Sequence, residues 1–137
     1  MTKKKRRMMF AGAVVVLLGG WLLVNPPGRF GICTFGLTTY GCIPYPASDI
    51  QVRGDGQTRS VEKTHALRLE HVQWLLDPMP SFLIIGIGWD GATTPEEGIK
   101  DVKSCEVQIL KTGEAVKEYN RRKERGEDVA IHVHSTC

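Results

Sequence analysis

A run of seventeen apolar residues near the amino terminus constrains this chain more than any other feature. The run extends from Met8 to Val24 and contains no charged residue. An α-helix of this length rises about 25 Å, slightly less than the roughly 30 Å hydrocarbon core of a bilayer. Snorkelling of Arg7 and an interfacial position for Trp21 can cover the difference. We therefore expect residues 8–24 to form one transmembrane anchor.

The apolar run has two other interpretations besides the anchor. A cleaved export signal also combines a basic start with an apolar middle, but this run is long for a signal and no small-x-small pair follows it closely. A helix buried in a soluble core is the third alternative. The Asn-Pro-Pro-Gly sequence at residues 25–28 ends the helix in any of these cases. We favour the uncleaved anchor.

The cations around the anchor predict its orientation. Residues 3–7 are five consecutive lysines and arginines, whereas Arg29 is the only cation soon after the anchor. Because cytoplasmic flanks carry an excess of Lys and Arg, residues 1–7 should form a cytoplasmic tail. The chain would then be a single-pass protein of the cell membrane, with everything after Val24 on the outer side, periplasmic or extracellular.

The charge of the remaining chain does not favour a nucleic-acid partner. The net charge of +3 combines +5 from residues 3–7 with −2 from the rest, where 13 Lys and Arg face 15 Asp and Glu. Nucleic-acid-binding domains normally show a clustered positive face. The one dense cluster, residues 121–125, is interleaved with glutamates, and we interpret it as a solvated helix face. The expected partners are the lipid bilayer and a membrane protein, with no nucleic acid.

The segment after the anchor divides into a linker and one domain. Residues 25–33 form a short linker that two prolines stiffen, and residues 34–137 are enough for one domain with a single modest core. In the first half of that domain, the β-prone segments 35–45 and 49–52 predict an antiparallel ribbon. A Gly-Asp-Gly turn at residues 54–56 follows, and a further strand and a helix come after it.

The second half of the domain alternates β-prone with helical segments. These segments are, in order, residues 82–87, 95–103, 105–110, 113–125 and 128–134. Short helical crossovers favour parallel neighbouring strands with helices on the sheet. Thr94, Pro95 and Glu97 predict a capping box at the start of the first of these helices. The expected fold class is α/β: a single compact domain with a mixed sheet, preceded by one transmembrane helix.

Four cysteines permit two disulfides if the domain lies in an oxidising compartment. Cys33 and Cys42 are the expected pair, because they are close in sequence just beyond the anchor. Two free thiols, with Cys42 in a strand, are the equally weighted alternative. No spacing resembles a C-x-x-C zinc or redox site.

The sequence Gly-Ile-Gly-Trp-Asp-Gly at residues 86–91 matches the G-x-G-x-x-G dinucleotide fingerprint after a strand. The context argues against a nucleotide, because the following helix begins later and its first turn carries Glu96 and Glu97, which would repel a pyrophosphate. We interpret the loop as a tight turn or a shallow site for a ligand or partner. Its candidate residues are Gly86, Gly88, Trp89, Asp90 and Gly91.

Two histidines, His132 and His134, form a candidate polar face. Alternation along a strand places both imidazoles on the same side. A metal site would need a third ligand, from Cys137, His65 or a carboxylate brought close by folding. We instead expect a pair of partly exposed histidines, with no metal and no cofactor. No nucleophile with a neighbouring base can be identified, so no catalytic residue is predicted.

The order and spacing of several short motifs resemble one known domain family. Their residues are, in order, Phe35-Gly36, Tyr45, Asp49-Ile50, Gly54-Asp55-Gly56, Thr64-His65, Leu83-Ile84-Ile85-Gly86-x-Gly88, Pro95, Cys105-Glu106-Val107, Thr112-x-Glu114-Ala115-Val116-Lys117-x-Tyr119-Asn120 and His134-Ser135-Thr136-Cys137. Together they look like the domain shared by mitochondrial respiratory complex I assembly factors, an adipogenesis-associated protein and small bacterial and archaeal proteins of undefined activity.

This resemblance covers nearly everything beyond the anchor and implies a compact α/β fold with a mixed sheet. It implies assembly or interaction proteins rather than enzymes, and it supplies no catalytic residues. The anchor is a departure, because the relatives are typically soluble and intracellular. We therefore expect a non-catalytic, membrane-anchored binding or assembly module. The alternative is a small-molecule binder or weak enzyme that uses a cleft at the glycine loop, with His132 or His134.

Overall fold

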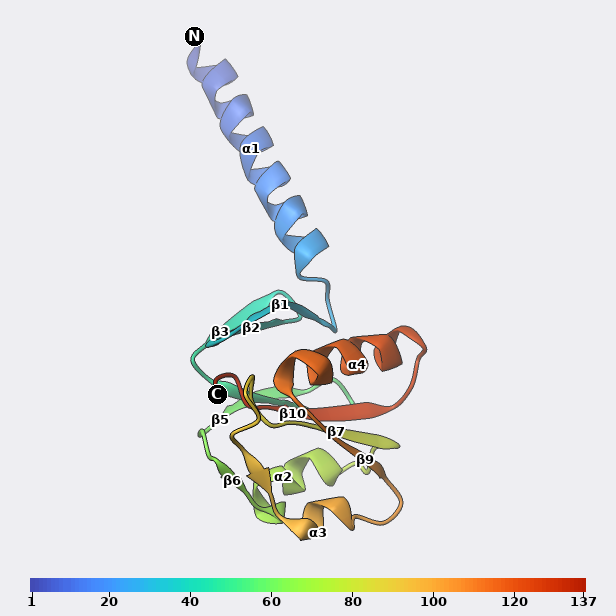
Figure 1. Ribbon diagram of the computed structural model, residues 1–137. Coiled ribbons are helices and arrows are strands. Elements are labelled where there is room, and N and C mark those ends of the chain that lie inside the picture. The colour runs from blue at the N-terminus through green and yellow to red at the C-terminus, as the bar shows by residue number, and fades with distance from the viewer.

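The computed structural model describes residues 1–137 and begins with the long helix α1, Lys3–Val24. Its 22 residues rise about 33 Å, so the helix is long and apolar enough to cross a membrane by length and composition. The side chain of Thr2 caps its first turn, and Asn25 caps its last. No residue of α1 is buried, and the helix projects away from the rest of the molecule (Figure 1).

A three-stranded antiparallel sheet, called here the ribbon, follows α1. It consists of β1 Phe30–Thr34, β2 Leu37–Tyr40 and β3 Ile43–Pro46, in the order β1-β2-β3. The predicted antiparallel ribbon is confirmed for its first segment, residues 35–45, but it starts earlier than expected, and the second segment, residues 49–52, belongs to the central sheet. Residues 30–33, which the sequence assigned to the linker, belong to β1. Only residues 25–29 separate the helix from the ribbon, which lies next to the end of α1 (Figure 1).

The centre of the domain is a mixed five-stranded sheet with the order β5-β4-β10-β7-β9. β10 pairs in parallel with β7, and β7 in parallel with β9, as the alternating segments predicted. β4 is antiparallel to both β10 and β5. The strands are β4 Asp49–Val52, β5 Thr58–Val61, β7 Phe82–Gly86, β9 Glu106–Leu110 and β10 Val129–Val133.

Helices cover the two faces of this sheet unequally. The helix α4, Thr112–Glu124, lies over one face together with the ribbon (Figure 1). On the other face lie the short helices α2 Leu69–Val72, η1 Gln73–Leu76 and α3 Glu97–Lys100. The parallel pair of β6, Ala66–Leu67, with β8, Thr94–Pro95, runs beside these helices. The predicted α/β fold with a mixed sheet is confirmed.

The face under α4 carries the larger apolar cluster, called here the aromatic face. The rings of Phe30, Tyr40 and Tyr119 meet edge to face, with centroids 5.0–5.9 Å apart. The hydroxyl groups of Tyr40 and Tyr119 share a 2.8 Å hydrogen bond, so no polar atom of this trio is left without a partner. The other buried members are Ile50, Val52, Ile84, Ala115, Val116, Val129, Ile131 and Val133.

The opposite face, called here the distal face, has a second apolar cluster beneath the short helices. Leu83 and Ile85 of β7 point into it and are fully buried. Its other buried members are Leu67, Val72, Leu75, Leu76, Ile99 and Ala130. A fully buried aliphatic side chain stabilises a fold by about 1.5–3 kcal/mol. This half of the distal face therefore holds α2, η1 and α3 on the sheet.

The predicted capping box at Thr94 is not formed. Thr94 and Pro95 lie in β8, and α3 begins only at Glu97, with Glu96 as its N-cap residue. The Thr94 N–H donates to the His65 carbonyl at 2.8 Å, as part of the pairing between β6 and β8. The strand pairing between β6 and β8 has therefore overridden a local helix signal.

Candidate functional site

The other half of the distal face carries a row of buried polar side chains. Asp49 and Gln51 come from β4, and His132 and His134 come from β10 or its end. The antiparallel register sets His132 opposite Gln51. Their neighbours Ile131 and Val133 point to the aromatic face, as alternation along the strand predicted.

The two histidines are not partly exposed, which corrects the sequence prediction. His132 and His134 are 1% and 0% exposed. The chain before and after β6 covers them: the His65 ring lies against that of His134 with centroids 5.2 Å apart, and the His71 carbonyl reaches the Gln51 amide next to His132. The sequence could not show this cover, because it depends on the path that the folded chain takes around β6 and not on a local pattern.

His132 belongs to a hydrogen-bonded chain that fixes its tautomer. Gln51 Oε1 accepts from Arg59 Nε at 3.0 Å, so the amide nitrogen of Gln51 faces His132 Nδ1 at 3.1 Å. The Nδ1 atom must then be an acceptor, and burial lowers the pKa of His132 to about 4, so its ring is neutral. The ring proton lies on Nε2, which is buried and has no hydrogen-bond partner among the protein atoms.

A cleft of about 670 Å³ opens along this row, between β5 and the segment that includes β6 and α2. Nine of its twelve lining residues are not hydrophobic. Arg59 and Lys63 stand in its wall, while Arg68 is already paired with Glu70. The polar lining includes Gln51, Arg59, Lys63, Arg68, His71 and His132.

Asp49 anchors the other end of the polar row. Its Oδ2 lies 2.7 Å from His134 Nδ1, and its Oδ1 accepts from the Ser135 N–H at 2.9 Å and from the Ser135 hydroxyl at 3.3 Å. Both Asp49 and His134 are 0% exposed. A buried carboxylate is tolerable only when it is hydrogen-bonded in this way. The His134 ring is consequently held with its Nε2 edge free of the carboxylate.

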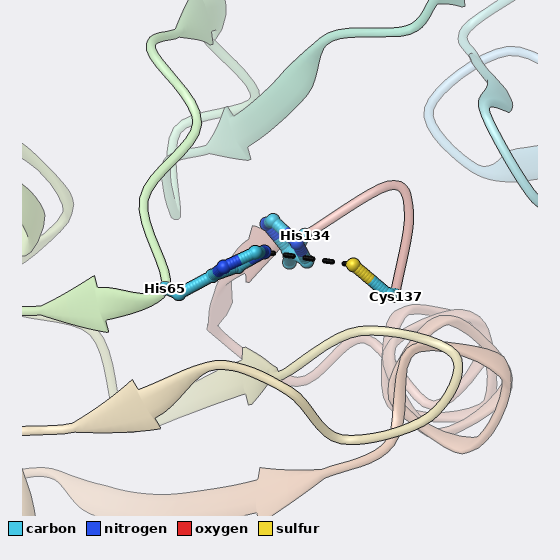
Figure 2. Close-up of side chains that lie close together, drawn as sticks. All are labelled: His65, His134 and Cys137. Atoms are coloured by element: carbon cyan, nitrogen blue, oxygen red, sulfur yellow. Dashed lines mark hydrogen bonds between the residues drawn. The ribbon is translucent and has the colours of Figure 1, made fainter.

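Two more side chains with metal-ligand chemistry lie near the His134 ring, whose Nε2 is 3.4 Å from Thr136 Oγ1. His65 lies just before β6, and Cys137 lies three residues after His134. The three ligand atoms are all within 4.8 Å of one another, and Cys137 Sγ is 3.5 Å from His65 Nε2. Figure 2 shows the three side chains converging from different segments. His65 and Cys137 are among the third ligands that the sequence named, and folding brings both to His134.

The glycine loop that resembled a dinucleotide fingerprint holds residues 136–137 of its own chain. The N–H of Trp89 donates to the Thr136 carbonyl at 2.8 Å, and the N–H of Asp90 donates to the Cys137 carbonyl at 3.0 Å. Gly88 has φ +102, and a Cβ there would lie 2.3 Å from the Cys137 main chain. The loop therefore positions the Cys137 thiol, and only glycine fits at residue 88.

The remaining loop residues differ in how accessible they are. Gly86 is buried at the end of β7, and the half-buried Trp89 ring packs over Gly113 at the start of α4. Asp90 is exposed, and Gly91 is half-buried at φ +76. A partner can therefore reach the loop mainly through Asp90, so the prediction of a partner or ligand at this loop has less free surface than the motif suggested.

Cys33 and Cys42, the expected disulfide pair, are free thiols in the structure. Burial raises the pKa of the Cys33 thiol to about 11, so it stays protonated. Cys42 has φ 72 at the turn between β2 and β3, and its Sγ donates to the Asn25 carbonyl at 3.0 Å. The turn geometry thus directs Cys42 toward the end of α1. The free thiols correspond to the alternative prediction, except that Cys42 lies in a turn and not in a strand.

The junction between α1 and the ribbon is a hydrogen-bonded unit that the sequence did not reveal. Trp21 Nε1 donates to the Cys42 carbonyl at 3.1 Å. The buried Asn25 side chain donates to the Trp21 carbonyl and accepts from Ile32 N–H and Thr39 Oγ1. The sequence indicates Asn25 only as part of a helix-breaking segment.

No protein-family model and no curated protein match this sequence. Solved structures do match it. The protein MT938 shares 32% identity, and the alignment covers 80% of this chain and 98% of MT938 with a TM-score of 0.68.

Two more distant structures have the same fold. A conserved hypothetical protein, PH1505, from Pyrococcus horikoshii OT3 is 22% identical over 80% of this chain and 99% of its own, with a TM-score of 0.68. An outer membrane protein from Bartonella henselae is 18% identical over 81% of this chain and 98% of its own, also with a TM-score of 0.68. At these identities the likeness concerns the fold alone.

Proposed function

Because this chain belongs to the family that includes MT938 and also carries an exposed apolar helix, we propose that it is a membrane-tethered, non-catalytic binding module. In this proposal it helps a membrane protein complex to assemble or to remain stable. Its resemblance to respiratory complex I assembly factors supports such a role. The length and apolar composition of α1 support a membrane setting.

The observation that carries this proposal is the junction between α1 and the ribbon. A flexible tether would let the domain rotate freely, whereas here Trp21 and Asn25 bind the base of the helix to the ribbon. Such a junction presents one constant surface to a neighbour in the same membrane. It also raises the effective concentration of the domain at that neighbour.

The surface next to this junction is the proposed contact for the partner. Ile43 follows Cys42, which accepts the Trp21 indole N–H, and its side chain is 56% exposed. An exposed isoleucine beside an apolar helix suits either the membrane interface or an apolar patch on a membrane protein. The loop after α3, on the far side of the domain from α1, contains Lys103 and provides a comparison point (Figure 1).

We propose the orientation with the amino terminus in the cytoplasm and the domain on the outer side of the cell membrane. Residues 3–7 are cationic, and no cluster of this kind follows Val24 closely. An impermeant maleimide applied to intact cells or spheroplasts should then label the domain, whose Cys105 is half-exposed. A Thr2→Cys substitution should add one label only after lysis. Extra labelling of the Thr2→Cys variant before lysis would indicate the opposite orientation.

The partner is tested by photo-crosslinking in the native membrane. A photoreactive amino acid at Ile43 should yield a crosslink to one membrane protein, and the same amino acid at Lys103 should not. Asn25→Ala should weaken the Ile43 crosslink, because it releases the helix from β1 and β2.

Two results would contradict the binding-module proposal. Equal crosslinking from Ile43 and Lys103 would show no preferred surface. An unchanged Ile43 crosslink after α1 is replaced by a cleavable export signal would show that the tether plays no part.

The cleft supports a second candidate function, the binding of a small oxygen-rich molecule. The specific observation is the His132 Nε2–H, which is buried at the cleft without a protein acceptor, close to the cationic Arg59. A carboxylate or phosphate oxygen would satisfy this donor. Native mass spectrometry of the purified full chain should reveal a retained small molecule. If the Arg59→Gln variant retained the same small molecule to the same extent, binding in this cleft would be contradicted.

A further inference from the structure

The separation of the ligand atoms in the cluster of His65, His134 and Cys137 matches tetrahedral metal coordination. Zinc binds imidazole nitrogen at about 2.0–2.1 Å and thiolate sulfur at about 2.3 Å, so a nitrogen and a sulfur on one tetrahedral ion lie about 3.5 Å apart. Cys137 Sγ and His65 Nε2 are 3.5 Å apart. All three ligand atoms lie within 4.8 Å, so only small side-chain adjustments would close the set.

The support behind His134 is of the kind that metal-ligating histidines have. Metal ligands of this type almost always donate their second ring N–H to a carboxylate or carbonyl, which fixes the tautomer and raises the basicity of the other nitrogen. Asp49 Oδ2, 2.7 Å from His134 Nδ1, occupies that position. Asp49 is itself fixed by the N–H and the hydroxyl of Ser135.

The Cys137 thiol is held in place by main-chain contacts rather than by a flexible tail. Its carbonyl accepts hydrogen bonds from the N–H groups of Asp90 and Ala92, at 3.0 and 3.1 Å. Gly88 permits this close approach. The glycine loop therefore has a role in the cluster that neither a turn nor a nucleotide site explains.

The cluster is open to solvent on one side. His65 is exposed, Cys137 is half-exposed and His134 is buried, so an ion can enter past His65. Three protein ligands leave a fourth tetrahedral position for water or another donor. The arrangement of the three side chains around a common centre is visible in Figure 2.

We infer that His65, His134 and Cys137 bind a divalent transition-metal ion, with Zn²⁺ as the ion that fits best. Two imidazoles and one thiolate are zinc ligands, whereas Ca²⁺ and Mg²⁺ require oxygen ligands. On binding, the Cys137 thiol becomes a thiolate that bonds to the metal, and its proton is released to solvent. The site lies on the distal side of the domain and does not depend on the proposed tether function.

The test uses the full chain in mild detergent, without a histidine tag and stripped of metal with a chelator. Titration with Co²⁺ should give one equivalent bound, visible d–d bands of tetrahedral cobalt and a near-ultraviolet sulfur-to-cobalt charge-transfer band. Zn²⁺ should displace the cobalt, because zinc is bound more tightly than cobalt at such sites.

Variants separate the ligands from other histidines and cysteines. His65→Ala, at an exposed position, and Cys137→Ser should each lower the Zn²⁺ affinity by about 10-fold or more, and Cys137→Ser should also remove the charge-transfer band. The matched controls His71→Ala and Cys105→Ser should bind as the unaltered chain does. Asp49→Asn, which changes a positioning residue, should lower affinity by about 10–100-fold and keep the charge-transfer band.

Three outcomes would overturn the metal site. They are the absence of stoichiometric Co²⁺ binding, a cobalt spectrum without the sulfur band, and Zn²⁺ affinity unchanged in both His65→Ala and Cys137→Ser. Because the two ligand variants alter exposed or half-exposed side chains, their circular dichroism spectra should match that of the unaltered chain, which separates metal loss from unfolding.

Discussion

The two faces of the five-stranded sheet are built from the same strands but differ in what they bury. The aromatic face, beneath α4 and the ribbon, buries mainly apolar side chains, and its two tyrosine hydroxyls satisfy each other. Its buried Arg122, on α4, is paired with Glu118 and Glu127. The distal face is apolar only where α2, η1 and α3 cover it. Next to them, on β4 and β10, it buries Asp49, Gln51, His132 and His134.

This difference separates a stabilising surface from a chemical one. Buried polar groups contribute less to stability than apolar packing and are costly when unpaired. The distal face nevertheless keeps an unpartnered His132 Nε2 and a converging set of His65, His134 and Cys137. On the side of α4 and the ribbon, Thr38 Oγ1 is also buried without a hydrogen-bond partner, but no set of metal-ligand side chains converges there. That side instead joins the domain to α1 through the ribbon. We infer that tethering and ligand chemistry are divided between the two faces.

The largest effect should come from the aromatic face. Tyr119→Ala removes a fully buried ring that packs against Phe30 and Tyr40 and leaves a cavity between α4 and the ribbon. The expected loss is about 3–5 kcal/mol in the free energy of unfolding. Urea unfolding of the full chain in mild detergent, followed by tryptophan fluorescence, measures it.

The matched control for this substitution is Tyr119→Phe. It keeps the ring and removes only the 2.8 Å hydrogen bond to Tyr40, so about 1 kcal/mol should be lost. If Tyr119→Ala cost no more than Tyr119→Phe, the aromatic face would not be the stabilising one.

The sequence predicted the elements whose signals are local and periodic. The apolar run gave the long helix, and alternating segments gave the parallel pairing of β7 with β9 and β10. The prediction failed where a tertiary contact competes with a local signal. Thr94 and Pro95 read as a helix start, but their main chain pairs with β6 instead. Likewise, β1 lay within a presumed linker, because its partner strand, not its own pattern, defines it.

The site could be predicted only in part. The spacing of His132 and His134 predicted their common face but no metal, because a metal site would have needed a third ligand from elsewhere in the chain. The sequence could not identify His65 and Cys137 as the residues near His134, because their positions depend on Gly88 and on the path of the β6 segment. Burial of the two histidines was also missed, because no periodic signal marks the chain that covers them. A pairing of Asp49 with His134 across 85 residues leaves no local trace.

An intermediate effect should come from the polar end of the distal face. Asp49→Asn removes the charge that holds His134 Nδ1 and the Ser135 N–H, and it replaces one acceptor oxygen with a donor. The expected loss is about 1–3 kcal/mol in the free energy of unfolding. The measurement is made with a chelator present, so that a bound metal does not contribute. If Asp49→Asn lowered the free energy of unfolding as much as Tyr119→Ala, the two faces would contribute equally to stability.

The smallest effect on stability should come from His132→Leu. Leucine fills a similar space, removes the buried Nε2–H that has no partner and loses one hydrogen bond from Gln51, whose amide still donates to the His71 carbonyl at 2.8 Å. Because the gain and the loss oppose each other, the free energy of unfolding should change by less than about 1 kcal/mol. Any small molecule that the cleft retains should be lost from this variant at the same time. A destabilisation as large as that expected for Asp49→Asn would mean instead that His132 is a structural residue, and the division between the two faces would then be limited to the cluster at His134.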